Sequence, residues 1–349
     1  MKKLLYLMHI DWNWIFQRPQ ILAKALEEDF ECKVVFPKSM VNKGAVAKKN
    51  ISPKNGVVAY RIPLQRQIPF IKWLNQKIIK WTIGDCSKYD VLWVCHPDLM
   101  KYIPVDYSGK VVYDCMDNHT AMVPEEDRQE LEKWEAKLLE RADLVLVTSL
   151  KLKEIINVGE KASLVRNGYR ESYVFPIAAS CKKEKYKIGY FGTVANWFDF
   201  DLLKRNLEVT NKVEYHIIGP CDVEKISHSN IVFEGTVEHA KLYEFVKEYD
   251  ALIMPFVVND IILSVDPVKL YEYISFGKCI ISVYYPEIER FEPYVYFYRN
   301  QEEYDKLIQE LEEKGFPAKY TEEQQKNFLR ENSWEYRYKV IKNEIEKLF

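Results

Sequence analysis

Short apolar runs alternate with amphipathic segments along almost all of the 349-residue chain. The apolar runs have the length of buried parallel strands, and the segments between them carry apolar residues at helical spacing. Such alternation indicates an α/β fold of parallel sheets covered by helices. The predicted strands are 3–10, 32–37, 57–62, 91–95, 111–114, 144–148, 162–166, 187–192, 213–218, 231–234, 250–254, 279–283 and 295–298. The predicted helices are 18–29, 70–83, 124–142, 150–157, 200–209, 239–248, 267–276, 301–314, 321–331 and 333–349.

The chain is longer than one hydrophobic core usually supports, which predicts two domains. A polar stretch at 178–185 is the best candidate for a linker between them. We therefore expect a first domain over 1–177 and a second over 186–332. The last helix, 333–349, carries an apolar stripe and is predicted to pack across another surface.

Composition and charge narrow the class of protein. A net charge of -2 gives no general attraction to nucleic acid. The seven cysteines are scattered without any C-x-x-C spacing, which is typical of reduced thiols in the cytoplasm and predicts no zinc site. The apolar start of the chain is broken by His9 and Asp11, so it reads as a first strand and not as a signal peptide. We expect a cytoplasmic protein.

The segment 266–282 combines a helix start with charged residues. Asp266 is predicted to cap a helix that has Pro267 at its first position. The unpaired amides of a first helical turn attract anions, so a diphosphate suits this turn, with Lys269 beside it. Glu272 lies one turn further on, where a carboxylate is able to accept two hydrogen bonds from a ribose diol. The alternative is an ordinary surface ion pair between Lys269 and Glu272.

Ligands of doubly wound sheets bind at the carboxyl ends of the strands. Two such sheets side by side place a cleft there, so function is sought in the loops that follow the strands. These loops are 9–18, 96–98, 114–119, 192–199, 219–220, 235–237 and 255–269.

The ordered set of loop sequences resembles a known family. The second half contains Lys-Ile-Gly-Tyr-Phe-Gly-Thr (187–193), Tyr-His-Ile-Ile-Gly-Pro (215–220), Ile-Val-Phe-Glu-Gly-Thr-Val (231–237) and Asp-Ala-Leu-Ile-Met-Pro-Phe (250–256) before the 266–282 segment. The first half contains Phe-Gln-Arg-Pro-Gln (16–20), Val-Val-Tyr-Asp-Cys-Met-Asp-Asn-His (111–119) and Val-Arg-Asn-Gly (165–168). This set is similar to GT-B glycosyltransferases, especially those of family 4 and of teichuronic acid biosynthesis.

The resemblance implies a GT-B fold, with two Rossmann-like domains facing a central cleft and the 333–349 helix crossing back to the first domain. It also implies a nucleotide-sugar donor, expected to be a UDP-sugar. Glu272 would then bind the ribose, and the amides of Val268 and Lys269 the diphosphate. The remaining donor-side residues implied by the resemblance are Gly192 and Thr193 near the phosphates and Gly235, Thr236 and Val237 near the base.

Three positions depart from the family pattern. Many family 4 members contact the donor sugar with a glutamate where this chain has Ser264. They also bind the diphosphate with an arginine and a lysine where this chain has Thr193 and Phe198. A serine hydroxyl is still able to bind a sugar, but the charge of the leaving nucleotide must be met elsewhere. The candidates are the helix amides together with Lys269, Arg166, Arg170 or Arg18.

Asp117 is the leading catalytic candidate because it follows a buried strand at its carboxyl end. A carboxylate there would act as base toward an acceptor hydroxyl, with a cap or turn residue as the alternative. His119 is the second candidate, with a loop histidine as its alternative. Trp14, Arg18 and His96 are candidates for acceptor or phosphate contact, or, for the tryptophan, for plain packing.

Residues 68–83 combine aromatic and aliphatic side chains with three lysines and no acid. Such a helix is able to rest on an anionic membrane surface, which would bring a lipid-linked acceptor close. The alternative is a helix buried against the first sheet with its lysines reaching outward. No stretch has the ~20 apolar residues of a membrane span.

These observations predict a glycosyltransferase that moves a sugar from a UDP-sugar to a cell-surface polysaccharide or glycolipid, on the cytoplasmic side of the membrane. The resemblance favours retention of anomeric configuration and requires no metal or other cofactor. A nicotinamide oxidoreductase is disfavoured, since no G-x-G-x-x-G follows a strand. The alternatives are a GT-B nucleotide-sugar epimerase and a non-catalytic glycan-binding or partner subunit.

Overall fold

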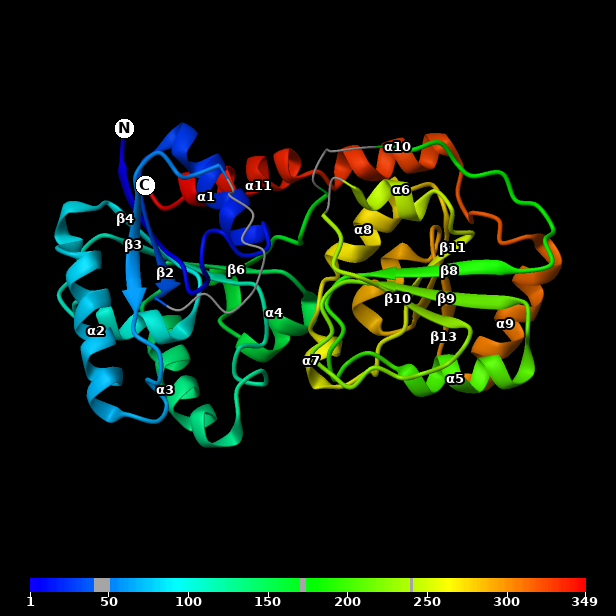
Figure 1. The fold of residues 1–349 in the computed structure, drawn as a ribbon. Helices are drawn as coiled ribbons and strands as arrows, with labels where there is room; N and C mark the ends of the chain where they lie inside the picture. Colours follow the sequence, from blue (N-terminus) through cyan, green and yellow to red (C-terminus); the bar gives the residue numbers. More distant parts are fainter. Residues whose placement is uncertain (41–50, 170–173, 239–240) are drawn as a thin grey trace. The chain divides into compact units, whose positions relative to one another are not determined.

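The computed structural model describes residues 1–40, 51–169, 174–238 and 241–349. They form two compact units (Figure 1). Unit 1 contains Met1–Arg166 together with Arg337–Phe349, and unit 2 contains Asn167–Tyr336. The division by contacts therefore falls at Asn167, so that the described residues of 167–177, which we had expected in the first domain, lie in unit 2.

Unit 1 is built on a sheet of seven parallel strands in the order β3-β2-β1-β4-β5-β6-β7. The strands are β1 (Lys3–Leu7), β2 (Glu31–Ser39), β3 (Gly56–Arg61), β4 (Val91–Val94), β5 (Lys110–Cys115), β6 (Leu144–Val147) and β7 (Ala162–Leu164). The central strands β4 and β6 are buried along their whole length. Because a parallel sheet is covered on both faces, these strands are continuously apolar in sequence.

Helices cover this sheet, and short 3₁₀ turns lie in the connections. The helices are α1 (Arg18–Asp29), α2 (Pro69–Ile83), α3 (Glu125–Arg141) and α4 (Leu150–Ile156). The 3₁₀ turns are η1 (Cys86–Lys88), η2 (Pro97–Tyr102) and η3 (Gly159–Lys161). The strands and helices predicted for this half of the chain are thus confirmed, apart from small differences at their ends.

Unit 2 is built on a sheet of six parallel strands in the order β10-β9-β8-β11-β12-β13. The strands are β8 (Tyr186–Phe191), β9 (Val213–Ile218), β10 (Ile231–Gly235), β11 (Ala251–Met254), β12 (Cys279–Val283) and β13 (Tyr296–Tyr298). The helices are α5 (Phe200–Val209), α6 (Leu242–Val246), α7 (Asp260–Leu263), α8 (Val268–Ser275), α9 (Gln301–Lys314) and α10 (Glu322–Glu331), with a 3₁₀ turn η5 (Pro286–Phe291). Of these, α7 and η5 were not predicted, and residues 239–240 of the predicted 239–248 helix lie outside the described residues.

The last helix, α11 (Trp334–Glu346), begins in unit 2 and continues into unit 1 (Figure 1). Within unit 1, Asp29 at the end of α1 accepts hydrogen bonds from the Tyr338 hydroxyl at 2.7 Å and from Lys342 Nζ at 2.6 Å. The Ser163 hydroxyl of β7 donates to Glu344 Oε2 at 2.8 Å. The predicted return of the final helix to the first domain is confirmed.

Candidate functional site

Each sheet has one point where the strand order reverses. In unit 1 this point lies between β1 and β4, and in unit 2 between β8 and β11. At such a point the connections on either side run to opposite faces of the sheet, which leaves space beyond the strand ends where ligands bind. The two sheet edges are described separately, each within its own unit.

Three histidines gather at the edge of the unit 1 sheet. His9 follows β1, His96 follows β4, and His119 follows β5, which are adjacent strands. The ring centroids of His9 and His96 lie 5.0 Å apart, those of His96 and His119 4.6 Å, and those of His9 and His119 5.6 Å. The three rings therefore form one cluster, called here the histidine cluster, across the point of reversal.

The histidine cluster is uncharged at neutral pH. Burial lowers the pKa of His9 to about 3, and electrostatic repulsion from His96 and Arg61 acts in the same direction. Burial also lowers the pKa of His96 to about 4 and that of His119 below its usual value. His9 Nδ1 and His119 Nε2 are buried and have no hydrogen-bond partner among the described residues. Neutral rings with such nitrogens are suited to binding hydroxyl groups.

The cluster does not have the geometry of a metal site. Across the described ranges of the chain, no group of three or more His, Cys, Asp or Glu side chains is arranged to hold a metal ion. His96 has a local structural role as well, because its Nδ1 accepts a hydrogen bond from the Asp98 amide at 3.2 Å and so caps η2.

Asp117 lies in the same loop as His119, two residues beyond β5. Burial raises the pKa of Asp117 to about 6, against the opposing effect of Arg18. The neighbouring Asn118 supplies the turn, since its Oδ1 accepts from the Thr120 hydroxyl at 3.1 Å and from the Ala121 amide at 3.3 Å. No described residue donates a hydrogen bond to the Asp117 carboxylate. Asp117 therefore does not act as the cap of this turn, and its carboxylate retains the properties of a base.

Arg18 has a different role from the expected one. Its guanidinium is buried and pairs with Asp114 of β5, with an Nη2 to Oδ1 distance of 2.8 Å. Arg18 Nη1 also donates to the Val165 carbonyl at 2.9 Å. A guanidinium held in this way by a carboxylate and a carbonyl is a structural tie between three segments of unit 1. Arg18 was expected among the candidates for phosphate or acceptor contact, and in this structure its guanidinium is occupied by Asp114 and Val165.

The two tryptophans of the 9–18 loop differ in exposure. Trp12 is buried and its Nε1 donates to the Ile51 carbonyl at 3.1 Å, so it packs the fold. Trp14 is exposed and remains a candidate for contact with a sugar ring. Arg166, at the end of unit 1, is half-buried. Arg170 lies outside the described residues.

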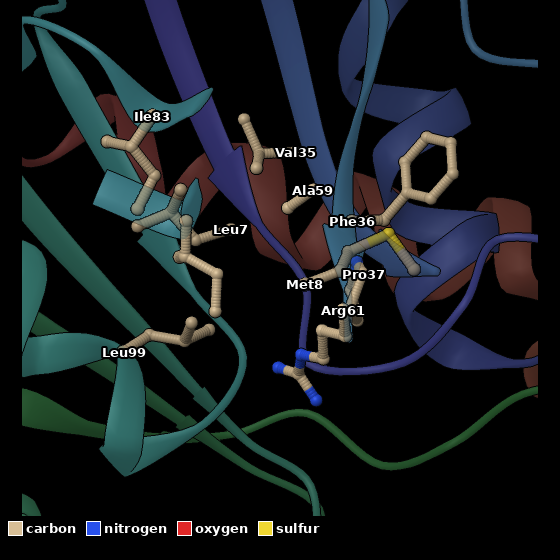
Figure 2. Close-up of a pocket in the computed structure, with 10 residues that line it drawn as sticks. Leu7, Met8, Val35, Phe36, Pro37, Ala59, Arg61, Ile83 and Leu99 are labelled. Carbon is tan, nitrogen blue, oxygen red and sulfur yellow. The ribbon is translucent and has the colours of Figure 1, made fainter. Parts of the chain in front are cut away.

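A small cavity in unit 1 lies between strands of the sheet and α2 (Figure 2). Its walls are mostly apolar side chains of β1, β2, β3 and α2, and Arg61 lies at its edge. The volume is about 10 Å³, roughly the space of one water molecule. This cavity is too small for a sugar, and we assign it no ligand.

Two glycines make the edge of the unit 2 sheet unusually close-packed. Gly192 follows β8 with φ +137°, and Gly219 follows β9 with φ +138°. A Cβ on Gly219 would lie 2.1 Å from the Gly192 carbonyl oxygen. The close approach and the backbone angles both require glycine, so the Gly192-Thr193 turn presents bare backbone at the reversal point.

Lys269, in the first turn of α8, lies directly against this turn. A Cβ on Gly192 would be 2.3 Å from Lys269 Cε. The ammonium lies 5.6 Å from the ring centroid of Tyr190 and 5.7 Å from that of Phe256. Burial lowers the pKa of Lys269, while Glu272 one turn away opposes this effect. The Lys269 side chain is half-buried, and no described residue accepts a hydrogen bond from its ammonium. The ammonium lies next to helix amides that also lack intrahelical acceptors.

We had expected Asp266 to cap α8, and this prediction is wrong. The N-cap is Pro267, and the buried Asp266 carboxylate accepts hydrogen bonds from the Asn167 amide at 2.5 Å and from the Tyr271 hydroxyl at 3.1 Å. Arg290 forms an ion pair with the same carboxylate. Asp266 therefore fixes the segment that leads into α8, and so positions Lys269 and Glu272 indirectly.

Two of the departures from the family pattern are filled by buried side chains. Ser264, which was expected at the sugar-binding position, is buried, and its hydroxyl donates to the Ile261 carbonyl at 2.8 Å. Phe198 packs edge-on against Tyr190, with ring centroids 4.8 Å apart. Tyr190 in turn donates to the Thr193 carbonyl at 2.7 Å. These aromatic rings form the wall on which the Lys269 side chain rests.

The remaining donor-side candidates lie at the end of β10 and on α8. Gly235 has φ +76°, and its carbonyl accepts a hydrogen bond from the Gly219 amide at 2.8 Å. Thr236 is exposed and Val237 half-buried, while Val268 is exposed and Glu272 half-buried. The candidate loops after β8, β9 and β10 and the start of α8 thus lie along one edge of unit 2.

Sequence reasoning missed two features of these edges. His9 was named only as a break in the first apolar run and as part of a loop, although it lies two residues beyond the end of β1, as His96 lies two residues beyond the end of β4. The aromatic wall under Lys269 was missed because Tyr190, Phe198 and Phe256 come from separate segments, and only the fold brings them together.

Comparisons with known proteins agree with this geometry. No family model matches the chain. It is 24% identical over 234 residues to "Putative teichuronic acid biosynthesis glycosyltransferase TuaH" of Bacillus subtilis (strain 168), and the match spans 59% of each chain. The similarity is therefore to just under three fifths of that relative's length.

Solved structures match over nearly the whole chain. Sucrose-phosphate synthase of Thermosynechococcus elongatus superposes with a TM-score of 0.71 at 12% identity, over 100% of this chain and 99% of that one. The lipopolysaccharide outer core galactosyltransferase WaaB gives 0.67 at 13% identity, over 99% and 100% of the two chains. HepE of Anabaena, solved with UDP-glucose, gives 0.66 at 13% identity, over 100% and 99%. With two parallel doubly wound sheets and these neighbours, the chain has the GT-B fold of glycosyltransferases.

Proposed function

We propose that this protein is a glycosyltransferase that moves a sugar from a UDP-sugar to a cell-surface polysaccharide or glycolipid. The observation that carries the proposal is the half-buried Lys269 side chain, whose ammonium end lies beside Gly192 at the reversal point of the unit 2 sheet. A cation that forms no ion pair with a described residue, and lies next to helix amides without intrahelical acceptors, favours a ligand that supplies negative charge. A nucleoside diphosphate has the charge and shape to do so.

In this proposal the α8 segment binds the donor. The amides of Val268 and Lys269 and the Lys269 ammonium bind the diphosphate, and Glu272 accepts hydrogen bonds from the ribose. The Gly192-Thr193 turn allows the phosphates to approach the backbone. Gly235, Thr236 and Val237 lie where the base would pack. One similar solved structure supports a UDP-sugar as the donor, since HepE of Anabaena was solved with UDP and glucose and with UDP-glucose.

The chemistry breaks the bond between the anomeric carbon and the β-phosphate oxygen and forms a bond from that carbon to an acceptor oxygen. The UDP leaves with the electron pair, and its new charge is stabilised by Lys269 and the α8 amides. The acceptor proton passes to a base, either the leaving phosphate in a retaining course or Asp117 in an inverting one. The family resemblance favours retention. His119 and His96, as neutral rings, would orient hydroxyl groups, and Trp14 would stack on a sugar ring.

The proposal places the protein on the cytoplasmic side of the membrane, where nucleotide sugars are available to it, and it assigns no metal ion to the reaction. Within the described residues no helix is long and apolar enough to cross a bilayer. A lipid-linked or polymeric acceptor is the partner that fits the similarity to a teichuronic acid biosynthesis glycosyltransferase.

A thermal-shift screen of nucleotides followed by product analysis tests this function. UDP and UDP-sugars should raise the melting temperature, because a ligand that binds only the folded state stabilises it by mass action, whereas UMP should do so weakly. A transferase then releases UDP only when acceptor is present. An epimerase would return an isomerised nucleotide sugar, and a non-catalytic subunit would leave the sugar unchanged. If no nucleoside diphosphate shifts the melting temperature, the donor site is refuted.

A further inference from the structure

Helix α2 turns its aromatic side chains away from the rest of unit 1. Its inner face, with Asn75, Ile79, Thr82 and Ile83, is buried. It packs against β2 and β3 of the unit 1 sheet. The opposite face carries Phe70, Trp73 and Trp81, whose exposed fractions are 65%, 50% and 85%.

The exposed aromatic residues form a continuous stripe on the helix. Phe70, Trp73, Lys77 and Trp81 follow one another at intervals of three or four residues, which places them on one face. The rings of Phe70 and Trp73 stack with centroids 5.7 Å apart, and Lys77 Nζ lies 5.6 Å from the Trp73 ring. Leu64 and Ile68, in the turn before the helix, are exposed as well and extend the apolar surface.

The charges on this face are all positive. Residues 62–84 contain Arg66, Lys72, Lys77 and Lys80 and no acidic residue. Lys72 pairs with Glu130 of α3 at 3.6 Å. Arg66, Lys77 and Lys80 form no ion pair with any described residue. Basic side chains interleaved with tryptophan and phenylalanine are the composition of helices that lie in the interface of an anionic bilayer.

We propose that the outer face of α2, with the turn before it, docks unit 1 on an anionic lipid bilayer. The rings enter the headgroup region and the basic side chains contact lipid phosphates. A second copy of the chain is a poorer occupant of this face, because a two-fold interface would bring Lys77 and Lys80 against the same lysines of the partner. This docking does not depend on the donor chemistry, and it would hold a membrane-bound acceptor near the enzyme.

Flotation of the full-length protein with phosphatidylcholine vesicles, with and without about 30% phosphatidylglycerol, tests the proposal. We expect binding only to the anionic vesicles, weakened by salt. Replacing Lys77 and Lys80 together by Gln should reduce the affinity by about 25-fold, which is about fivefold for each charge. Replacing Trp73 and Trp81 together by Ser should abolish binding, because the buried apolar area is lost. Brominated lipids should quench tryptophan fluorescence in the unmodified protein and not in this variant.

The matched control removes two lysines from α9 of unit 2, as Lys306→Gln with Lys314→Gln, where no large apolar side chain is exposed. It changes the net charge by the same amount and should leave binding unchanged. The proposal would be overturned if the α2 and α9 lysine variants lost vesicle binding equally, or if the unmodified protein did not bind anionic vesicles. If the Trp73 and Trp81 variant instead converts a dimer to a monomer in sedimentation, with no vesicle binding by either protein, the face is a contact between copies. A separate assay measures the release of UDP in the presence of a water-soluble acceptor. The α2 variants should retain this activity, so that loss of vesicle binding is distinguished from loss of transferase activity.

Discussion

At the scale of single residues, the ionisation of Asp117 is opposed by the fold. Burial raises its pKa from 3.8 to about 6, so the folded protein holds this proton more tightly than the unfolded chain does. Stability therefore falls as pH rises from about 4 to about 6, and the full cost, about 3 kcal/mol, is present above pH 6. A residue kept at such a cost is typical of a functional group.

Asp117→Asn removes this cost. We expect the variant to be more stable than the unmodified protein at pH 7, by up to about 3 kcal/mol, and to lose this advantage near pH 4. Urea unfolding at the two pH values measures the difference. If Asp117 is the base, kcat/KM of the unmodified enzyme should fall below pH 6, and the variant should lose activity by a factor of about 10² or more. A variant that is no more stable at pH 7 would contradict the buried ionisation.

Lys269, which is half-buried, and Lys278, which is buried, offer a comparison of two lysines of unit 2. The Lys278 ammonium donates to the carbonyls of Lys247 at 3.0 Å and Tyr249 at 2.7 Å, whereas that of Lys269 has no such acceptor. We expect Lys269→Met to leave the unliganded protein as stable as before, and to weaken UDP binding roughly tenfold to a hundredfold. Lys278→Met should cost about 1–3 kcal/mol of stability and leave UDP affinity unchanged. Calorimetric titration measures the UDP affinity of both variants, and urea unfolding measures their stability. A loss of stability in Lys269→Met with unchanged UDP affinity would show that Lys269 is structural.

At the scale of elements, periodicity predicted nearly all strands and helices, since alternation of apolar runs and amphipathic segments is a local property. It did not predict α7, which is only four residues long. Roles in the site were harder to predict because they depend on contacts between distant residues. Arg18 and Asp114 are 96 positions apart, and Asp266 and Asn167 are 99 apart, so no local pattern showed that these side chains bind each other.

Two of the hydrogen bonds that hold α11 on unit 1 are accepted by the Asp29 carboxylate. The hydrogen bonds of Asp29 with Lys342 and Tyr338 lower its pKa, and these groups are partly exposed. Asp29→Asn should therefore lower the free energy of unfolding at pH 7 by about 0.5–1 kcal/mol. The loss should be absent when Lys342→Met and Tyr338→Phe are already present, as a double-mutant cycle would show. Additive losses would indicate that Asp29 acts through other contacts.

At the scale of the whole molecule, the proposed donor residues all belong to unit 2, and the histidine cluster and Asp117 to unit 1. Binding of UDP alone should therefore slow amide hydrogen exchange in unit 2, at 192–199, 235–237 and 265–275. Mass spectrometry of peptides from these ranges measures the effect, and α9 peptides of the same unit serve as the internal control. Protection confined to unit 1 would mean that UDP binds there, and would contradict the assignment of the donor site to unit 2.

The composition of unit 1 from two separate stretches of chain has a consequence for synthesis on the ribosome. Residues 167–336 form unit 2 as one uninterrupted segment, whereas unit 1 needs both 1–166 and 337–349. During translation unit 2 is made entirely before the last segment of unit 1 emerges. Until then Asp29 has neither Lys342 nor Tyr338 to bind. The 1–166 part of unit 1 is thus completed only after the whole of unit 2 has been synthesised.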